Sequence, residues 1–452
     1  MGTTHPSPGF ALMTVAIAVA VLVVLATRCK VPSFIALLVC SIGVGIANGL
    51  APLATLTAFQ EGFGNLLGSI GIVVGLGAIL GRWLGASQGA AVIAEKFVAA
   101  FGEKNLPFAM LLTGFVVGLP VFFGVGLVLL LPVLFSVAKR TQQPFLKLAL
   151  PLVTGLSAAH GLVPPHPGPM AAIGLLKADP GRTLLWSILI GFPASLVGLI
   201  IWRFSPATTA AVGIPTLTSE SSTPPPKGRP GFSSSLFTVL LPALLMIGSM
   251  VLALASQGVP ETLRQVIALL GHPSVAMLAG VGCAAWLLGL SRGFKGKELL
   301  KLAEDSLGPT AGILFVVGAG GGFSKVLIAS GIAQAISDAS QHWSLSPLVL
   351  AWTVAAVIRV ASGSATVAIT TAAGMMQPWL AAHPEVKPEL IVISLGAGSL
   401  VLSHVNDGGF WLVKEFLGLS VIQTFKTWTL METLLSVLTL LILLGLHAVG
   451  VN

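Results

Sequence analysis

The sequence predicts an all-α polytopic membrane protein made of two inverted repeats, with about ten membrane crossings, two re-entrant hairpins and interrupted helices. Three observations predict this fold. Hydrophobic residues make up 55% of the chain and charged residues only 8%, whereas a soluble globular protein carries about 25% charged residues. Apolar runs of about 20 residues, the length that spans a bilayer as a helix, recur along the whole chain. The two halves also resemble each other at a fixed offset, which carries Gly75 onto Gly318.

Ten apolar runs predict the crossings. In the first half they cover residues 10–27, 32–50, 63–81, 146–176 and 184–202. In the second half they cover residues 236–255, 272–290, 309–328, 389–411 and 430–450. Basic residues gather in short loops, such as "RCK" at 28–30, and the positive-inside rule places these loops in the cytoplasm and both termini outside. The formal charge of +8 therefore reflects membrane topology and indicates no nucleic-acid partner.

Two further apolar stretches are too long for one crossing and too short for two. The first, 106–138, is broken at "GLP" and has charged residues at both ends, which predicts a hairpin that enters and leaves on the cytoplasmic side. The second, 346–380, is broken at "ASGSAT" and is expected to enter from the outside. Irregular backbone at membrane depth is tolerated only where protein encloses it or where it lines a cavity.

The repeat predicts two membrane domains, 1–217 and 232–452, joined by a cytoplasmic linker at 218–231 whose prolines, serines and glycines form no packed element. One fixed offset carries "GLGAILGRWLGAS" onto "GAGGGFSKVLIAS", "GLPVFF" onto "ASGSAT", and "HGLVPP" onto "SHVNDG". The backbone breaks therefore recur at the same places. Five crossings in each half invert the repeats, an architecture typical of secondary transporters that bind substrate near the membrane midplane.

The stretch "HGLVPPHPGP", residues 160–169, interrupts an apolar run with four prolines and carries two titratable rings. We predict that His160 and His166 hydrogen-bond a polar substrate. His166 is also a candidate for proton coupling, because histidine titrates near neutral pH. The alternative is a structural kink in which both rings cap free carbonyls.

The stretch "RVASGSATVAITT" places small hydroxyl side chains around a glycine in the middle of the second hairpin. We predict that Ser362, Gly363, Ser364 and Thr366 bind substrate, although such residues also serve as plain helix-packing contacts. Arg359 is a candidate partner for a substrate carboxylate and could equally cap the hairpin.

The stretch "SHVNDGGFW" places His404, Asn406 and Asp407 in an apolar run ahead of two glycines. Ionisable groups inside a membrane are costly and are functional by default. We predict that Asn406 binds substrate and that Asp407 and His404 take part in proton coupling, with Asp407 as the carrier. The alternative is a structural pair between Asp407 and His404. The three cysteines have no paired spacing, and we expect neither a metal nor an organic cofactor.

Three stretches closely resemble the gluconate permease family of gluconate:proton symporters: "VPPHPGPMAAIGLLKADPGRTLL", "RVASGSATVAITTAAG" and "SHVNDGGFWLVKEFLGLSVIQTFKTWT". The resemblance runs from about residue 60 to the C-terminus. It implies proton-coupled uptake of gluconate or a related small sugar acid or hydroxy acid across the bacterial inner membrane. It also implies the fold of a wider ion-transporter superfamily, in which homodimers hold a mobile transport domain on a scaffold.

The same resemblance implies where the site lies. It places hairpin tips near Pro120 and Gly363, and the first tip then includes Phe122, Phe123 and Gly124. It places helix breaks at Pro164–Gly168 and Asn406–Gly408, which adds Pro165 and Gly168 to the predicted substrate site. This chain departs from the family at Gly124 and Ala329, where members often have an acidic residue.

Other functions remain open from the sequence. A membrane-embedded enzyme could use His160, His166 and Asp407, but an enzyme has no need of inverted repeats. A sodium-coupled carboxylate carrier would also use broken helices, because free carbonyls bind sodium. A channel is disfavoured by the absence of a filter motif.

Overall fold

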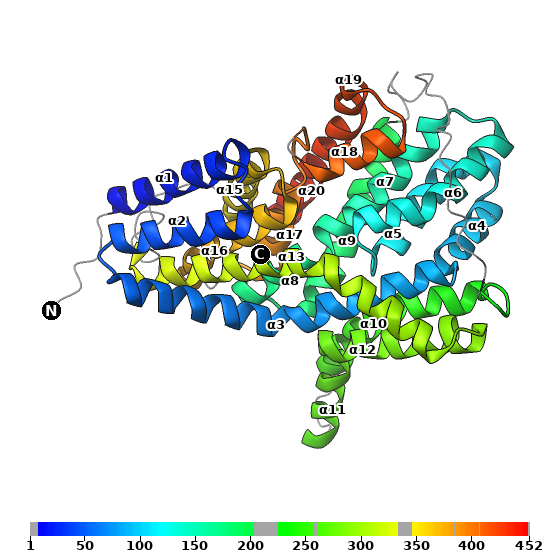
Figure 1. The fold of residues 1–452 in the computed structure, drawn as a ribbon, viewed down its shortest axis with the longest axis horizontal. Coiled ribbons are helices and arrows are strands. Elements are labelled where there is room, and N and C mark those ends of the chain that lie inside the picture. Colours follow the sequence, from blue (N-terminus) through cyan, green and yellow to red (C-terminus); the bar gives the residue numbers. More distant parts are fainter. Residues whose placement is uncertain are drawn as a thin grey trace.

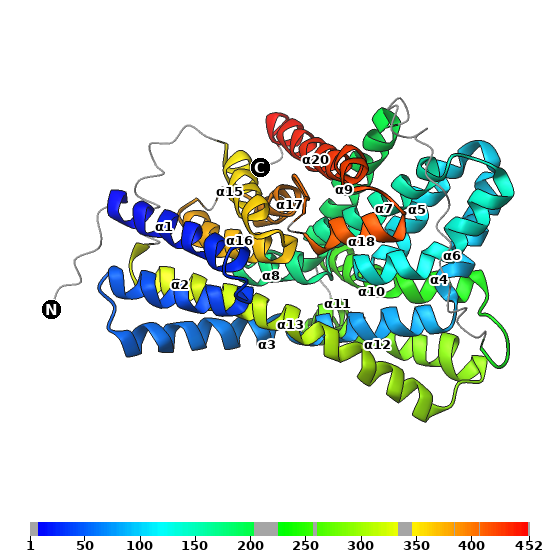
Figure 2. The same cartoon turned by 45° about the horizontal axis from the view of Figure 1, so that its top comes forward.

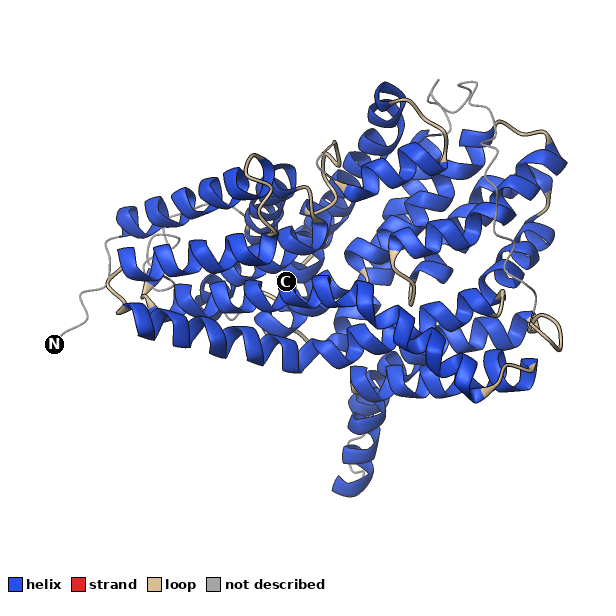
Figure 3. Ribbon diagram, viewed as in Figure 1, coloured by secondary structure: helices blue, strands red, loops and turns tan. Residues whose placement is uncertain are grey.

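The computed structural model describes residues 8–202, 225–255, 260–332, 346–383, 385–405 and 407–450, and within these ranges every regular element is a helix (Figure 3). Eight helical stretches of the described residues are long and apolar enough to cross a membrane, and shorter apolar helices accompany them. The chain is thus a multi-pass, all-α membrane protein, as the sequence predicts. Of the predicted linker, residues 218–224 lie outside the described residues, and 225–231 contain no helix.

The first half of the chain forms helices α1 to α9. Every predicted crossing of this half corresponds to one helix or to a broken pair. Helix α4 is an addition, because its apolar run of 13 residues contains Glu95 and Lys96 and is too short to suggest a span. The bounds are α1 Pro8–Thr27, α2 Ser33–Ala47, α3 Pro52–Ala86, α4 Gly89–Phe101, α5 Leu106–Gly118, α6 Phe123–Thr141, α7 Phe145–Leu162, α8 Pro167–Leu176 and α9 Pro180–Trp202.

The second half repeats this order with its own additions. Helix α11 is amphipathic, projects from the bundle and leaves Leu263 and Leu269 exposed (Figure 1). The π-helical turn Phe425–Thr429 leads directly into α20. The bounds are α10 Phe232–Ala255, α11 Glu261–Gly271, α12 Pro273–Ala284, α13 Gly296–Ala329, α15 Pro347–Ser362, α16 Ala365–Ala382, α17 Pro388–Gly398, α18 Gly408–Phe416, α19 Val421–Thr424 and α20 Leu430–Ala448.

Helices α3 and α13 run along the length of the molecule, side by side in Figure 1 and Figure 2. They are antiparallel, since Trp83 near the end of α3 donates a hydrogen bond of 3.0 Å to the Leu299 carbonyl near the start of α13. They have 35 and 34 residues, and the offset of the sequence repeat carries α3 onto α13 almost residue for residue. Antiparallel equivalents are what inverted repeats require, so the predicted architecture is confirmed.

Both predicted hairpins form, and each turns at the predicted break. Helices α5 and α6 meet at residues 119–122, and Gln143 Nε2 bonds the Glu103 carbonyl at 3.1 Å. That contact brings the two ends of the hairpin together, as a re-entrant segment requires. Helices α15 and α16 meet at Gly363, whose φ of +72° suits glycine.

The third pair of breaks separates α7 from α8 and α17 from α18. Prolines do not prevent α8, because Pro167 is its first residue, where a missing N–H costs nothing. In the second half the sequence analysis places His404 and Asp407 in an apolar run, and the structure places them in the break between two helices. Helix α17 ends at Gly398, both residues lie in the loop, and the two glycines start α18 rather than break it.

Glycines set the close approach of each hairpin to the broken helix of its own repeat. A Cβ at Gly155 of α7 would lie 2.2 Å from the Leu111 carbonyl oxygen of α5. A Cβ at Gly398 of α17 would lie 2.3 Å from the Trp352 carbonyl oxygen of α15. The two glycines are equivalents in the repeat, so both halves use the same backbone contact to position the breaks.

Candidate functional site

Four helices begin at the hairpin tips and at the helix breaks. They are the second helix of each hairpin, α6 and α16, and the second half of each broken helix, α8 and α18. The N-terminus of a helix presents unpaired N–H groups and a positive dipole end. The contacts described next connect these four N-termini into one site.

The first hairpin tip contacts both predicted histidines. His166 precedes α8, is only 2% exposed, and its Nε2 lies 2.6 Å from the Gly118 carbonyl oxygen at the end of α5. Its Nδ1 lies 3.3 Å from Nδ1 of His160, in the last turn of α7. The Phe122 ring packs against both imidazoles, with centroid distances of 6.4 Å to His160 and 6.1 Å to His166.

These contacts fix the hydrogen positions of the neutral rings. A carbonyl oxygen only accepts, so Nε2–H of His166 donates to Gly118. Nδ1 of neutral His166 then has a lone pair, and Nδ1–H of His160 donates to it. The remaining ring nitrogen, Nε2 of His160, therefore carries a lone pair and can accept a hydrogen bond or a proton.

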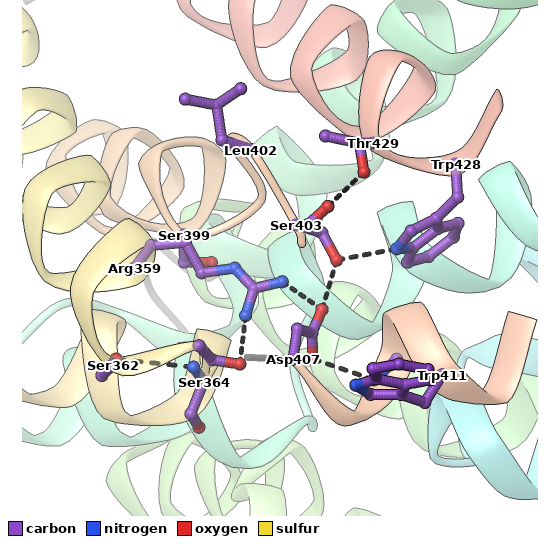
Figure 4. Close-up of polar contacts among 12 residues, drawn as sticks. Arg359, Ser362, Ser364, Ser399, Leu402, Ser403, Asp407, Trp411, Trp428 and Thr429 are labelled. Carbon is purple, nitrogen blue, oxygen red and sulfur yellow. Dashed lines mark hydrogen bonds and ion pairs between the residues drawn. The ribbon is translucent and has the colours of Figure 1, made fainter. Parts of the chain in front are cut away.

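The second hairpin tip is closed by an ion pair (Figure 4). Arg359 is 4% exposed, and one guanidinium nitrogen donates to the Gly363 carbonyl at 2.5 Å. The other terminal nitrogen bonds Oδ2 of Asp407, which precedes α18 and is 14% exposed. Oδ1 of Asp407 accepts the Gly409 N–H at 2.9 Å, so this carboxylate caps α18. The pair thus ties the second hairpin to the second helix break.

Ser403 and Trp428 connect this ion pair to the first hairpin. The Ser403 hydroxyl donates to Oδ2 of Asp407 and accepts the indole N–H of Trp428 at 2.7 Å (Figure 4). The Trp428 ring packs on Phe123, the first residue of α6, with a centroid distance of 5.1 Å. Trp428 therefore links the first hairpin to the helix break of the second repeat.

The structure brings some of the predicted site residues together and places others at the edge of the second hairpin tip. The structure brings together His160, His166, Phe122, Phe123, Arg359, Gly363 and Asp407. The hydroxyls of the second tip are half-buried, and Ser364 caps α16 by accepting the Val367 N–H at 3.3 Å, while Ser362 accepts the Ser364 N–H at 3.4 Å. Thr366 lies in the first turn of α16.

The remaining predicted residues are mainly packing contacts or lie elsewhere. Cβ atoms at Gly124 and Gly168 would lie 3.0 Å from Leu412 and 2.7 Å from Ile369, so both glycines let helices of opposite repeats pack closely. Pro120 is buried and Pro165 half-buried in the turns beside them. His404 is half-buried in the loop before Asp407, which pairs with Arg359. Asn406 lies outside the described residues, so its predicted substrate contact stays a prediction.

The sequence analysis missed Ser403, Trp428 and Glu432. Glu432 lies in the apolar run of α20, is 1% exposed, and its carboxyl group interacts with the Ser157 hydroxyl of α7. A glutamate inside a predicted span was a signal that could have found it. Trp428 and Ser403 had no such signal, because tryptophan and serine are ordinary residues of membrane helices.

The described residues contain no group of three or more histidine, cysteine, aspartate or glutamate side chains placed to hold a metal ion. What they do provide is one buried guanidinium, hydroxyls at a hairpin tip, an imidazole lone pair and four helix N-termini. These groups suit reversible binding of a small polar anion.

Inverted repeats whose hairpins and broken helices meet at one polar site define a secondary transporter, not an enzyme. The family model for the GntP family permease matches residues 10–449, and the chain belongs to this family.

Known proteins agree with this assignment. The chain is 42% identical to a gluconate permease of Pseudomonas aeruginosa, over 99% of both chains. It is 38% identical to the Gnt-II system L-idonate transporter of Escherichia coli, over 97% of this chain and 99% of that protein. The YdaH transporter of Alcanivorax borkumensis has the same fold, with a TM-score of 0.68 at 16% identity, over 92% of this chain and 98% of that one.

Proposed function

We propose that this transporter takes up gluconate or a related small sugar acid together with protons across the bacterial inner membrane. The convergence of four helix N-termini beside a buried guanidinium carries the proposal, because this arrangement attracts an anion inside a membrane. The similarity to a gluconate permease and to an L-idonate transporter supports a polyhydroxy acid as that anion.

Each end of such a substrate has a matching group in the site. Its carboxylate would approach Arg359 and the N-terminus of α16, where the hydroxyls of Ser362, Ser364 and Thr366 lie. Its hydroxyl groups would donate to the lone pair of His160 Nε2. Asn406, at the second helix break, would add an amide. His166 holds His160 in its tautomer and anchors the first hairpin tip through Gly118.

The coupling ion in this proposal is the proton, and the transporter works as a homodimer without a cofactor. The site contains titratable groups at each break, with His160 and His166 in the first repeat and Asp407 in the second. His404, His166 and Asp407 remain candidates for proton coupling. Light scattering of the purified protein in detergent tests the homodimer directly.

Uptake into proteoliposomes tests the function. Labelled gluconate, L-idonate and D-serine are each offered with an imposed proton gradient, a sodium gradient or neither. We expect accumulation of the sugar acids on a proton gradient, acid outside, and no additional accumulation on a sodium gradient. Accumulation that follows sodium alone would replace the proton with sodium, and transport restricted to D-serine would reject the sugar acid.

A further inference from the structure

Glu432 is a buried acid that the predicted site does not use. It lies in the first turn of α20, directly after the π-helical turn that carries Trp428. Its side chain is 1% exposed, and its Oε1 has no hydrogen-bond partner among the residues that the structure describes. A buried polar atom without a partner is rare in folded proteins and calls for an explanation.

A second unpartnered atom lies in the same region. Nε of Arg359 is buried and has no hydrogen-bond partner in the described part of the chain, although the two terminal nitrogens bond Gly363 and Asp407. Hydrogen bonds connect Glu432 to this region, because Thr429, one turn before it, donates to the Ser403 carbonyl, and the Ser403 hydroxyl donates to Asp407. Among the described residues only Asp407 forms an ion pair with Arg359.

The other charged groups around α20 lie elsewhere. Helix α17 carries Glu389 at its first turn, whereas α20 meets α17 at the opposite end, where Ser436 bonds the Ala397 carbonyl. Helix α9 carries Arg182 in its exposed first turn. Helix α7 carries His160 almost one turn beyond Ser157, and the π-helical turn carries Lys426. None of these groups forms an ion pair with Glu432 in the part of the chain that is described.

We propose that Glu432 is the residue that binds the transported proton. It does so because the substrate carboxylate competes with the Glu432 carboxylate for the positive charge of Arg359. The proposal rests on proton-coupled uptake of a sugar acid. The carboxylate of Glu432 takes a proton from the outer solution and becomes a neutral carboxylic acid, and it returns that proton to the inner solution after the substrate leaves.

Charge balance links the binding of the anion to the binding of the proton. In the empty site Asp407 balances Arg359, and an ionised Glu432 leaves one negative charge. A substrate anion would raise this to two negative charges in an apolar environment, which is strongly unfavourable. Protonation of Glu432 restores the original charge, so a bound proton favours binding of the anion, and a bound anion favours protonation of Glu432.

The test compares exchange with accumulation in proteoliposomes. Glu432→Gln keeps the size and the Ser157 contact but cannot bind a proton. We expect the variant to exchange labelled for unlabelled gluconate within about twofold of the wild-type rate, yet to lose all accumulation driven by a pH gradient. Glu432→Asp, which keeps a carboxyl group, should retain part of that accumulation. Wild-type accumulation by Glu432→Gln would overturn the proposal.

Glu389→Gln is the matched control. Glu389 is also a buried glutamate, 5% exposed, but its Oε1 accepts the Asp179 N–H at 3.4 Å. Its variant should accumulate gluconate as the wild type does, and an equal loss of accumulation in both variants would overturn the assignment to Glu432. If the wild type itself fails to accumulate gluconate on a pH gradient, the proposed function fails instead.

A measurement on the wild-type protein covers the case in which Glu432→Gln does not fold. A membrane-permeant carbodiimide reacts with carboxylic acids in apolar surroundings. We expect peptide mass analysis to find modification at Glu432 in proportion to the loss of accumulation. Proteoliposomes treated in the same way without substrate should remain sealed. An unmodified Glu432, or a modified Glu432 with intact accumulation, would overturn the proposal.

Discussion

At the scale of single residues, Arg359 joins two elements that the sequence separates. Its guanidinium bonds Gly363 at the tip of its own hairpin and Asp407 at the start of α18, 48 positions away. The sequence marks both residues as unusual, since each is an ionisable group in an apolar stretch. It could not show that they pair, because pairing depends on how α15 packs beside the second helix break. The pairing also gives Asp407 a structural role, because it holds the second helix break against the hairpin tip.

Asp407→Asn tests this role. The variant leaves the buried Arg359 guanidinium without its ion-pair partner, and breaking a buried pair in this way costs about 3–5 kcal/mol. We expect lower thermal stability in detergent and loss of both exchange and gradient-driven accumulation. Exchange at the wild-type rate with accumulation lost would instead assign the proton to Asp407. The contrast with Glu432→Gln separates the two carboxyl groups.

His166→Ala tests the hydrogen-bonded pair of imidazoles, His160 and His166. The substitution removes the contact to the Gly118 carbonyl and frees His160 to rotate, so substrate hydroxyls lose a fixed acceptor. An unpaired polar group costs about 1–3 kcal/mol, which is roughly tenfold or more in affinity. We expect the apparent Km for gluconate to rise by about this factor. His383→Ala removes a histidine that stacks on Trp379 away from the site, and it should leave Km unchanged.

At the scale of elements, the sequence predicts more accurately which helical segments are interrupted than where each helix begins and ends. Glycine and proline clusters identified both hairpin turns and both interrupted helices, because these residues act on the backbone locally. Helices α4 and α11 were missed because both are too short to span a membrane. The start of α18 falls at the predicted break, but the capping role of Asp407 was missed because it depends on the local turn.

Gly155→Ala and Gly398→Ala test the repeated contact between hairpin and broken helix. Each added Cβ would meet a backbone oxygen at 2.2 Å or 2.3 Å, so the helices must move apart. Overpacking of this kind costs about 1–3 kcal/mol. We expect both variants to lose thermal stability in detergent, measured by the temperature at which monodisperse protein is lost. Gly68→Ala is the control, because no atom of a neighbouring element that the structure describes lies within 4 Å of its added Cβ.

Equal stability of the two variants and the control would show that the helices separate freely. The repeat would then not depend on these two contacts.

At the scale of the whole molecule, the inverted repeat can be predicted from the sequence. The packing of each hairpin against the helix break of the other repeat cannot. A common offset relates α3 to α13 and each hairpin to its counterpart. That offset says nothing about which helices of opposite halves touch. The structure shows that α6 packs on α18 and α16 on α8, so each hairpin completes the other repeat's helix break. The four N-termini meet for this reason.

The last prediction concerns which parts move together. If α8 and α16 carry the site as one unit past the long pair of α3 and α13, contacts within the unit persist through the cycle. Ile369 and Thr370 are neighbours on α16 that face different partners: a Cβ at Gly168 of α8 would lie 3.6 Å from Cβ of Ile369, and a Cβ at Gly320 of α13 would lie 3.1 Å from Cβ of Thr370. The first distance falls within the range of about 3.5–4.5 Å for disulfides, and the second is a few tenths shorter.

Paired cysteines at these positions, in a chain without Cys29, Cys40 and Cys283, distinguish the two interfaces. Oxidation of the Gly168→Cys, Ile369→Cys variant joins α8 to α16 and should leave gluconate exchange intact. Oxidation of the Gly320→Cys, Thr370→Cys variant joins α13 to α16 and should stop exchange, and a reductant should restore it. The reverse pattern would mean that hairpin and broken helix slide past each other during transport.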